Sequence, residues 1–296
     1  MKDTVNELWR VGRFTPVAAY QRLAYVCGAL LVASGLFHVV VFLVDGGSWE
    51  GPVSWRKPIV FGLSFGITLV TLAWFMTFLR PRKAVGWTLL GLFSVGSVLE
   101  VLLVSMQKWR GVPSHFNNST PFDETVFSLM GALVSLLVLL TVIITARSFF
   151  PMDAPPSLAW AIRIGLVLML VSQAVGVQMI AVGSNTFGAS GALKVPHAVT
   201  LHALQVLPAL ALLALVFQVS EHLRMAVVAV GAAGYACLIG ATMVQTYGGR
   251  GPLDVGVVTS VFALSGVALL AVSALTAVGL ANPLLAVLSR RAVGHQ

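Results

Sequence analysis

Residues 124–147 read ETVFSLMGALVSLLVLLTVIITAR, and this stretch decides the class of fold. Between Glu124 and Arg147 it carries no charged side chain. A helix needs roughly 20 apolar residues of this kind to cross a hydrocarbon core about 30 Å thick. Such a segment belongs either in a bilayer or at the centre of a large soluble core, and the composition of the chain separates these two alternatives.

The chain is too poor in charge to cover a soluble core. Of its 296 residues, 58% are hydrophobic and 9% are charged, whereas a soluble domain carries about 25% charged residues. The mean hydropathy is +0.93. We therefore predict an all-α integral membrane protein in a lipid bilayer. Its eight predicted transmembrane helices lie at about 20–44, 58–79, 84–107, 124–147, 158–183, 195–219, 223–247 and 255–283.

Lysine and arginine indicate the orientation of these helices. With a cytoplasmic N-terminus, the outer side receives six of the 18 Lys and Arg residues, and the inner side receives the other 12. This asymmetry follows the positive-inside rule. We expect a multi-pass protein with a cytoplasmic N-terminal segment (1–19) and a cytoplasmic tail (284–296). No nucleic-acid partner is predicted, because no basic stripe is interleaved with exposed aromatic residues.

Three marks recur in the same order in the two halves of the chain. They are Lys57-Pro58 and Lys194-Val195-Pro196, QKWRG (107–111) and QTYGGRG (245–251), and Pro121-Phe122-Asp123 and Pro252-Leu253-Asp254. Because each half would hold four helices, both copies keep the same orientation. We therefore predict two parallel four-helix repeats, 20–150 and 151–283. The alternative is that such residues gather at helix ends in any membrane protein.

The polar residues concentrate in and below one predicted outer loop, QKWRGVPSHFNNSTPFD at 107–123. Below this loop, Glu100, His38 and His202 each lie six or seven residues inside the outer end of their segment. At 1.5 Å per residue, each is about 10 Å inside the outer interface. Ionisable residues within a span are costly and typically face a cavity or a partner. We predict a site with these three residues as its floor and the loop as its lid.

The residue types of this site suit acid–base chemistry or metal binding. The predicted catalytic residues are Glu100, Arg110, His115 and Asp123, and the predicted substrate-binding residues are Lys57, Gln107, Asn117, His197 and Gln205. His38 and His202 are the predicted ligands of a haem or another transition metal, because imidazole suits iron, copper and zinc alike. The alternative is that each histidine is an ordinary hydrogen-bonded packing residue. A covalently attached c-type haem is excluded, since no CxxCH motif is present.

Three strings stand out beside these patterns: WRKPIVF (55–61), RGVPSHFN (110–117) with TPFD (120–123), and PHAVTLHALQ (196–205). Together they resemble a family of polytopic bacterial membrane proteins. The likeness covers about 45–130 and 194–210, and those relatives often carry a longer Gly-rich loop than 184–193. The resemblance implies a multi-pass topology in the bacterial cytoplasmic membrane and no particular activity.

Three classes of function remain open. The first is a membrane-embedded enzyme or redox protein with its site in the outer leaflet, dependent on haem or metal or acting on a lipid-like substrate. The second is a proton-coupled transporter of a small molecule, in which Glu100 couples protons. The third is a structural subunit of a membrane complex. The sequence has no ATP-binding loop, Ser-centred nucleophile elbow, HExxH or EF-hand pattern, which disfavours nucleotide-driven pumping and the common hydrolases.

Overall fold

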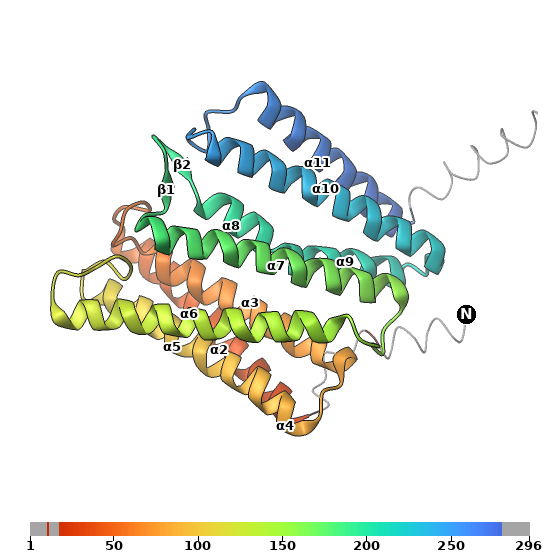
Figure 1. The fold of residues 1–296 in the computed structure, drawn as a ribbon, viewed down its shortest axis with the longest axis horizontal. Helices are drawn as coiled ribbons and strands as arrows, with labels where there is room; N and C mark the ends of the chain where they lie inside the picture. The colour runs from red at the N-terminus through yellow and green to blue at the C-terminus, as the bar shows by residue number, and fades with distance from the viewer. Residues whose placement is uncertain (1–10, 12–17, 280–296) are drawn as a thin grey trace, which may run out of the picture. The chain divides into compact units, whose positions relative to one another are not determined.

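The structure is a computed structural model that describes residue 11 and residues 18–279 (Figure 1). Within this part of the chain, eight helical segments are long and apolar enough to cross a membrane. They are Ala19–Asp45, Arg56–Leu79, Lys83–Trp109, Pro121–Ser148, Pro156–Val182, Lys194–Val216, Glu221–Tyr247 and Val257–Ala277. The prediction of an all-α membrane protein with eight spanning helices is therefore confirmed. Most of the predicted N-terminal segment and all of the predicted tail lie outside the described residues.

The described residues form two compact units, divided between Asp153 and Ala154. The first contains α2 (Ala19–Asp45), α3 (Arg56–Leu79), α4 (Lys83–Gly86), the π-helix η1 (Trp87–Gly91), α5 (Leu92–Trp109) and α6 (Pro121–Ser148). The second contains α7 (Pro156–Val182), β1 (Thr186–Phe187), β2 (Gly191–Ala192), α8 (Lys194–Leu201), α9 (Ala203–Val216), α10 (Glu221–Tyr247) and α11 (Val257–Ala277). The strands β1 and β2 pair antiparallel. Each unit thus holds four of the eight spanning segments.

In the first unit, α2 and α3 approach each other through glycines. A Cβ atom at Gly62 would lie 2.8 Å from the backbone nitrogen of Gly35. A Cβ atom at Gly66 would lie 2.7 Å from the carbonyl oxygen of Gly28. Both distances are too short for a side chain, so glycine is what allows the two backbones to pack this closely.

The end of α5 and the start of α6 are set by their terminal residues. Gly111 has a φ of 73°, and its N–H donates to the carbonyl of Lys108 at 2.9 Å, which ends α5 in the manner of a Schellman motif. At the start of α6, the Thr120 hydroxyl accepts a hydrogen bond from the N–H of Asp123 at 3.1 Å. Pro121 follows at the first helical position, where its missing N–H costs nothing. The end of α5 and the start of α6 therefore set where the connecting loop begins and ends.

The sixth spanning segment is interrupted, which the sequence analysis did not predict. His202 has a ψ of −4° and separates α8 from α9. Six residues later, Pro208 lies inside α9 and cannot donate to the carbonyl of Leu204. The segment therefore consists of two shorter helices in series.

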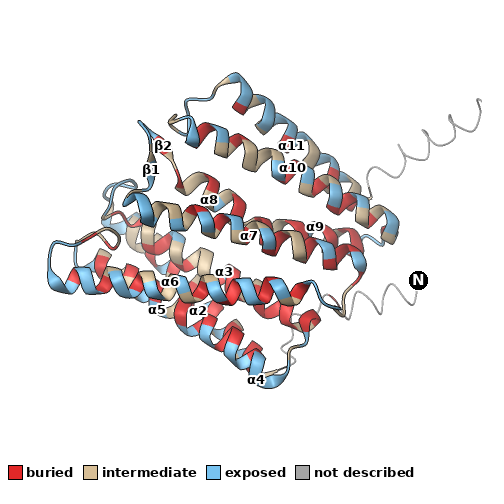
Figure 2. Ribbon diagram, in the orientation of Figure 1, coloured by how far each residue is buried: buried red, intermediate tan, exposed pale blue. Residues whose placement is uncertain are grey.

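Much of α11 is coloured as exposed in Figure 2, and the exposed residues of α2 and α11 include many large apolar ones. Leu43 and Val44 of α2 are 74% and 84% exposed, and Val257 and Leu264 of α11 are 82% and 70% exposed. In water such exposed apolar residues would form an aggregation surface, whereas in a bilayer they contact acyl chains. This distribution agrees with a multi-pass membrane protein.

Candidate functional site

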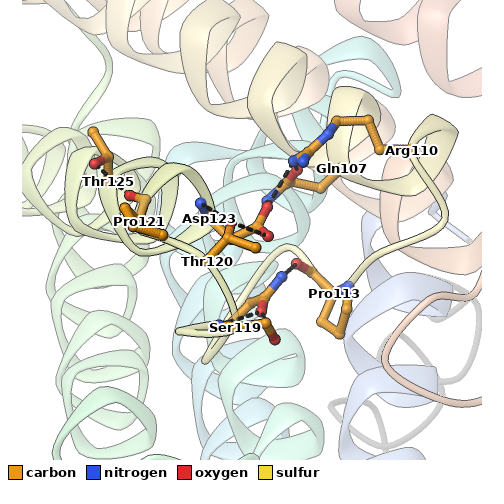
Figure 3. Close-up of polar contacts among 9 residues, drawn as sticks. Gln107, Arg110, Pro113, Ser119, Thr120, Pro121, Asp123 and Thr125 are labelled. Carbon is orange, nitrogen blue, oxygen red and sulfur yellow. Dashed lines mark hydrogen bonds and ion pairs between the residues drawn. The ribbon is translucent and has the colours of Figure 1, made fainter.

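The first unit closes the turn between α5 and α6 with a side-chain network that we call the first clasp, formed by Gln107, Arg110 and Asp123 (Figure 3). The amide of Gln107 donates to Asp123 Oδ1 at 2.9 Å, and the guanidinium of Arg110 donates to the same oxygen at 2.6 Å. Arg110 also donates to the amide oxygen of Gln107. The hydroxyl of Thr120 donates to Asp123 Oδ2 at 2.7 Å. The buried carboxylate is thereby neutralised and fully hydrogen-bonded, so Asp123 would have to break these bonds before it could transfer a proton.

Asn117 orders the loop that runs between the two ends of the first clasp. Its amide nitrogen donates to the carbonyl of Pro113 at 3.0 Å, and its amide oxygen accepts from the hydroxyl of Ser119 at 2.6 Å. Asn117 is 3% exposed. The side chain of Asn117 therefore makes its hydrogen bonds within the loop.

Two further polar residues of this loop, Ser114 and His115, contact side chains of α3. The ammonium of Lys57 donates to Ser114 Oγ at 3.4 Å, and Ser114 Oγ lies 2.9 Å from Nδ1 of His115. The ring of His115 packs against Phe61 of α3 and Phe127 of α6, with centroids 5.4 and 6.4 Å apart. Burial, and to a lesser degree the Lys57 ammonium, lowers the pKa of His115 from 6.5 to about 4. The imidazole is thus neutral at pH 7, and its Nδ1 can accept the Ser114 proton.

Among Lys57, Ser114 and His115, Ser114 is the residue that the sequence analysis missed. Its hydroxyl links Lys57 to His115, and the residue is 2% exposed. Its position beside His115 in the sequence was visible, but its contact with Lys57 depends on how the loop folds back over α3.

His38 of α2 lies in an aromatic cluster. Its Nδ1 donates to the carbonyl of Ser34 at 2.8 Å, and its Nε2 accepts from the indole N–H of Trp109 at 3.1 Å. Trp55 packs beside both rings, 6.0 Å from His38 and 5.0 Å from Trp109 between centroids. Because a carbonyl only accepts, Nδ1 must carry the proton and the lone pair of Nε2 is already used. As oriented, His38 offers no lone pair to iron or to another metal.

Glu100 of α5 is the predicted site residue that no local contact explains. It is 0% exposed, and neither carboxylate oxygen has a hydrogen-bond partner within the described chain. One turn further along α5, Val104 belongs to a buried apolar cluster with Met130 of α6, and Phe61 of α3 packs against this cluster. Glu100 therefore lies on the packed face of α5, about two turns below Gln107. Buried polar atoms without a partner are rare and call for a specific explanation.

The remaining predicted residues belong to the second unit. Nδ1 of His197 donates to the carbonyl of Ser172 at 2.8 Å, which ties α8 to α7. His202 lies at the interruption of the sixth segment, and its Nδ1 is 3.3 Å from the amide oxygen of Gln205. The amide nitrogen of Gln205 has no partner in the described residues. The predicted cavity shared by these residues with His38 and Glu100 would join the two units, and it stays a prediction.

Among the described residues, no group of three or more His, Cys, Asp or Glu side chains is arranged to hold a metal ion. Both ring nitrogens of His38 are hydrogen-bonded, and the predicted ligation of a haem or metal by His38 and His202 stays a prediction.

Neither the family models, nor the curated proteins, nor the solved structures contain a match to this chain. The resemblance of the three strings to a polytopic bacterial family therefore stays a prediction. The fold itself defines the class: a helical, multi-pass membrane protein with a buried acidic residue in its third spanning segment.

Proposed function

We propose that this chain is a membrane-embedded enzyme that carries out acid–base chemistry on a lipid-like substrate, with Glu100 as the proton donor. The observation that carries the proposal is the burial of Glu100 with both carboxylate oxygens unpartnered. An ionised carboxylate in apolar surroundings, with no partner, costs several kcal/mol, so the resting group holds a proton. A neutral carboxyl of this kind is suited to general acid catalysis.

The surroundings of Glu100 favour an apolar substrate. One turn from Glu100 along α5, Val104 belongs to a buried apolar cluster with Val126 and Met130 of α6, and Phe61 of α3 packs against this cluster. A bilayer-resident molecule such as an isoprenoid or quinone-like lipid would bring a double bond or a carbonyl oxygen to Glu100. The carboxyl would transfer its proton to that atom, and the resulting carboxylate would take a proton from a neighbouring carbon of the same substrate, so that the double bond moves and the carboxyl group is restored.

Carbodiimide labelling tests this proposal. A membrane-permeant carbodiimide reacts with protonated carboxyl groups in apolar surroundings, and mass spectrometry locates the adduct. Glu100 should be labelled at pH 7, whereas the more exposed Glu124 in the first turn of α6 should not. Glu100→Gln should abolish the label and change the lipid composition of membranes that produce the protein, relative to wild type and to Glu124→Gln. An unlabelled Glu100, or an unchanged lipid composition with Glu100→Gln, contradicts the proposal.

A proton-coupled carrier is the second candidate, because two observations favour it. The sixth segment is interrupted at His202, and broken helices commonly form transporter sites. Glu100 lies four residues from the middle of the third segment (Lys83–Trp109), or about 6 Å along the helix axis. Reconstituted vesicles with an imposed pH gradient distinguish the two candidates. Proton flux that depends on an added solute and is lost with Glu100→Gln would indicate transport.

A further inference from the structure

The second unit contains a cavity of about 240 Å³ lined by residues of α8, α10 and α11. Most of its wall is apolar, with Val195 and Val199 from α8, Leu238 from α10 and Ala263 from α11. The volume corresponds to about eight water molecules. It is below the range of about 300–1,000 Å³ of drug-sized sites, so it suits a small group.

One end of this cavity is polar and carries a positive charge. Arg250, Gln245 and Thr259 contribute to its lining. Arg250 Nη2 donates to Thr259 Oγ1 at 3.2 Å, and the Thr259 hydroxyl donates to the amide oxygen of Gln245 at 2.9 Å. We call this arrangement the second clasp.

The charge of Arg250 is not neutralised by the protein around it. The ion pairs recorded among the described residues involve Arg56, Arg80, Arg110 and Arg224, and no described carboxylate lies within ion-pair distance of Arg250. A guanidinium has five N–H donors, and the bond to Thr259 uses one of them. The others are available to a ligand.

We propose that this cavity binds an amphiphilic anion, with an oxyanion head on Arg250 and a hydrocarbon chain against α8, α10 and α11. An arginine fork matches the two oxygens of a carboxylate or phosphate, which accounts for the charge. The apolar wall indicates that the ligand carries a hydrocarbon chain, because this wall offers no hydrogen bonds to a fully hydrophilic anion. The head and first carbons of a lipid, or a short-chain acid, present the same chemistry. The proposal is independent of Glu100 and of the enzyme or carrier function.

Gly256 leaves the space that the Arg250 guanidinium occupies, so a substitution at Gly256 is a selective way to displace the guanidinium. A Cβ atom at Gly256 would lie 2.0 Å from Nη1 of Arg250 and 2.9 Å from its Cζ. The obstructing atoms are the far end of a flexible side chain, so Gly256→Ala should move the guanidinium and leave the fold intact. At Gly251, the nearest atom to an added Cβ is Ser190 Oγ at 3.8 Å. Gly251→Ala is therefore the matched control.

Calorimetric titration of the purified, delipidated full-length protein in a neutral detergent tests the site. The probes are octanoate, octyl phosphate and inorganic phosphate. Octyl phosphate and octanoate should bind, and inorganic phosphate should bind at least tenfold more weakly. Arg250→Gln and Gly256→Ala should each weaken octyl phosphate binding at least tenfold, whereas Arg250→Lys should weaken it less and Gly251→Ala should not change it. Ala263→Leu narrows the apolar wall and should weaken octyl phosphate more than butyl phosphate.

Native mass spectrometry of the protein before delipidation distinguishes the two sources of the ligand. An anionic phospholipid that is retained by wild type and lost with Arg250→Gln identifies a lipid head, whereas octanoate binding without such retention identifies a free acid. Three results would overturn the proposal: equal binding by wild type and Arg250→Gln, equal affinity for inorganic and octyl phosphate, or no binding together with no retained lipid.

Discussion

The turn after α5 and the turn after α10 are built from similar parts. In each, the carbonyl of a glutamine accepts the N–H of the residue five positions later, at 3.1 Å for Gln107 and 3.2 Å for Gln245. The third residue of the next helix then completes the side-chain network, Asp123 in α6 and Thr259 in α11. This likeness supports the predicted duplication, which nonetheless stays a prediction.

The two clasps differ in charge. In the first, Asp123 neutralises Arg110 and accepts hydrogen bonds on both oxygens. In the second, Thr259 offers only a hydroxyl, and Arg250 keeps its charge beside a cavity. A single difference at one helix position therefore separates a closed structural turn from a turn able to bind an anion.

The largest expected effect comes from giving the first clasp the residue of the second. Asp123→Thr removes the acceptor of Gln107 and the counter-charge of Arg110. Breaking a buried pair costs about 3–5 kcal/mol, and we expect about 2–3 kcal/mol because the Arg110 side chain is 38% exposed. Chemical unfolding in detergent measures the loss. Glu124→Thr, in the same helical turn, is the control and should lose well under 1 kcal/mol. Equal losses would show that Asp123 acts only on the helix dipole.

The next effect is a dependence of the unfolding free energy on pH. We expect it for the turn after α5, which contains His115, and not for the turn after α10. The folded pKa of His115 is lowered from 6.5 to about 4, so below pH 6.5 the unfolded chain binds more protons than the folded one. The stabilisation is fully present above about pH 6.5 and is lost as the pH falls toward 4, with a loss of about 2 kcal/mol already reached at about pH 5. Unfolding at a series of pH values should show this slope in wild type and a shallower slope in His115→Gln, because another buried histidine, His38, remains. His222→Gln, at an exposed position, should keep the slope.

A smaller effect is expected when the second clasp receives the residue of the first. Thr259→Asp places a carboxylate beside Arg250 and in the first turn of α11, and both interactions are favourable. We expect a gain of about 1 kcal/mol in unfolding free energy and a loss of octyl phosphate binding. Thr259→Asn introduces a side chain of the same size as aspartate but without its charge. It should therefore give a smaller gain in unfolding free energy and a smaller loss of octyl phosphate binding than Thr259→Asp. Stronger anion binding in the aspartate variant would contradict the comparison of the two clasps.

The smallest effect concerns the glycines that end α5 and α10. Gly111 and Gly249 have φ values of 73° and 67°, which strain any residue with a Cβ atom. Alanine at either position should cost about 0.5–1 kcal/mol, and the two costs should agree within a few tenths. Thermal unfolding of the two single variants measures this. A clear difference would mean that the two turns are not equivalent in their backbone.

The helices could be predicted because a bilayer leaves few alternatives to them. A long apolar run such as 124–147 satisfies its backbone only as a helix. The interruption at His202 could not be predicted in this way, because no Gly or Pro lies at that position and Pro208 follows six residues later. At this point the hydroxyl of Tyr235 in α10 donates at 2.7 Å to the carbonyl of Val199, which the N–H of Ala203 would use in a continuous helix.

The polar contacts were predicted only in part. Gln107, Arg110 and Asp123 were expected in one loop, and the short connection brings them together. The marks Pro121-Phe122-Asp123 and Pro252-Leu253-Asp254 are not equivalent in the structure, because the first opens α6 whereas the second forms a turn before α11, which begins at Val257. Proline and aspartate favour a turn as much as a helix start, so the pattern alone pointed to Asp254 in place of Thr259.

The glycine contacts between α2 and α3 limit how the first unit can move. Each of Gly28, Gly35, Gly62 and Gly66 faces backbone atoms of the opposite helix, so a slide along the axis by one residue would drive side chains into the opposing backbone. We therefore expect α2 and α3 to move together as one rigid body, which acts as a lever. Any conformational cycle in this unit must then be carried by motion of α5 and α6 against that lever, and the packed face that holds Glu100 lies on the moving side.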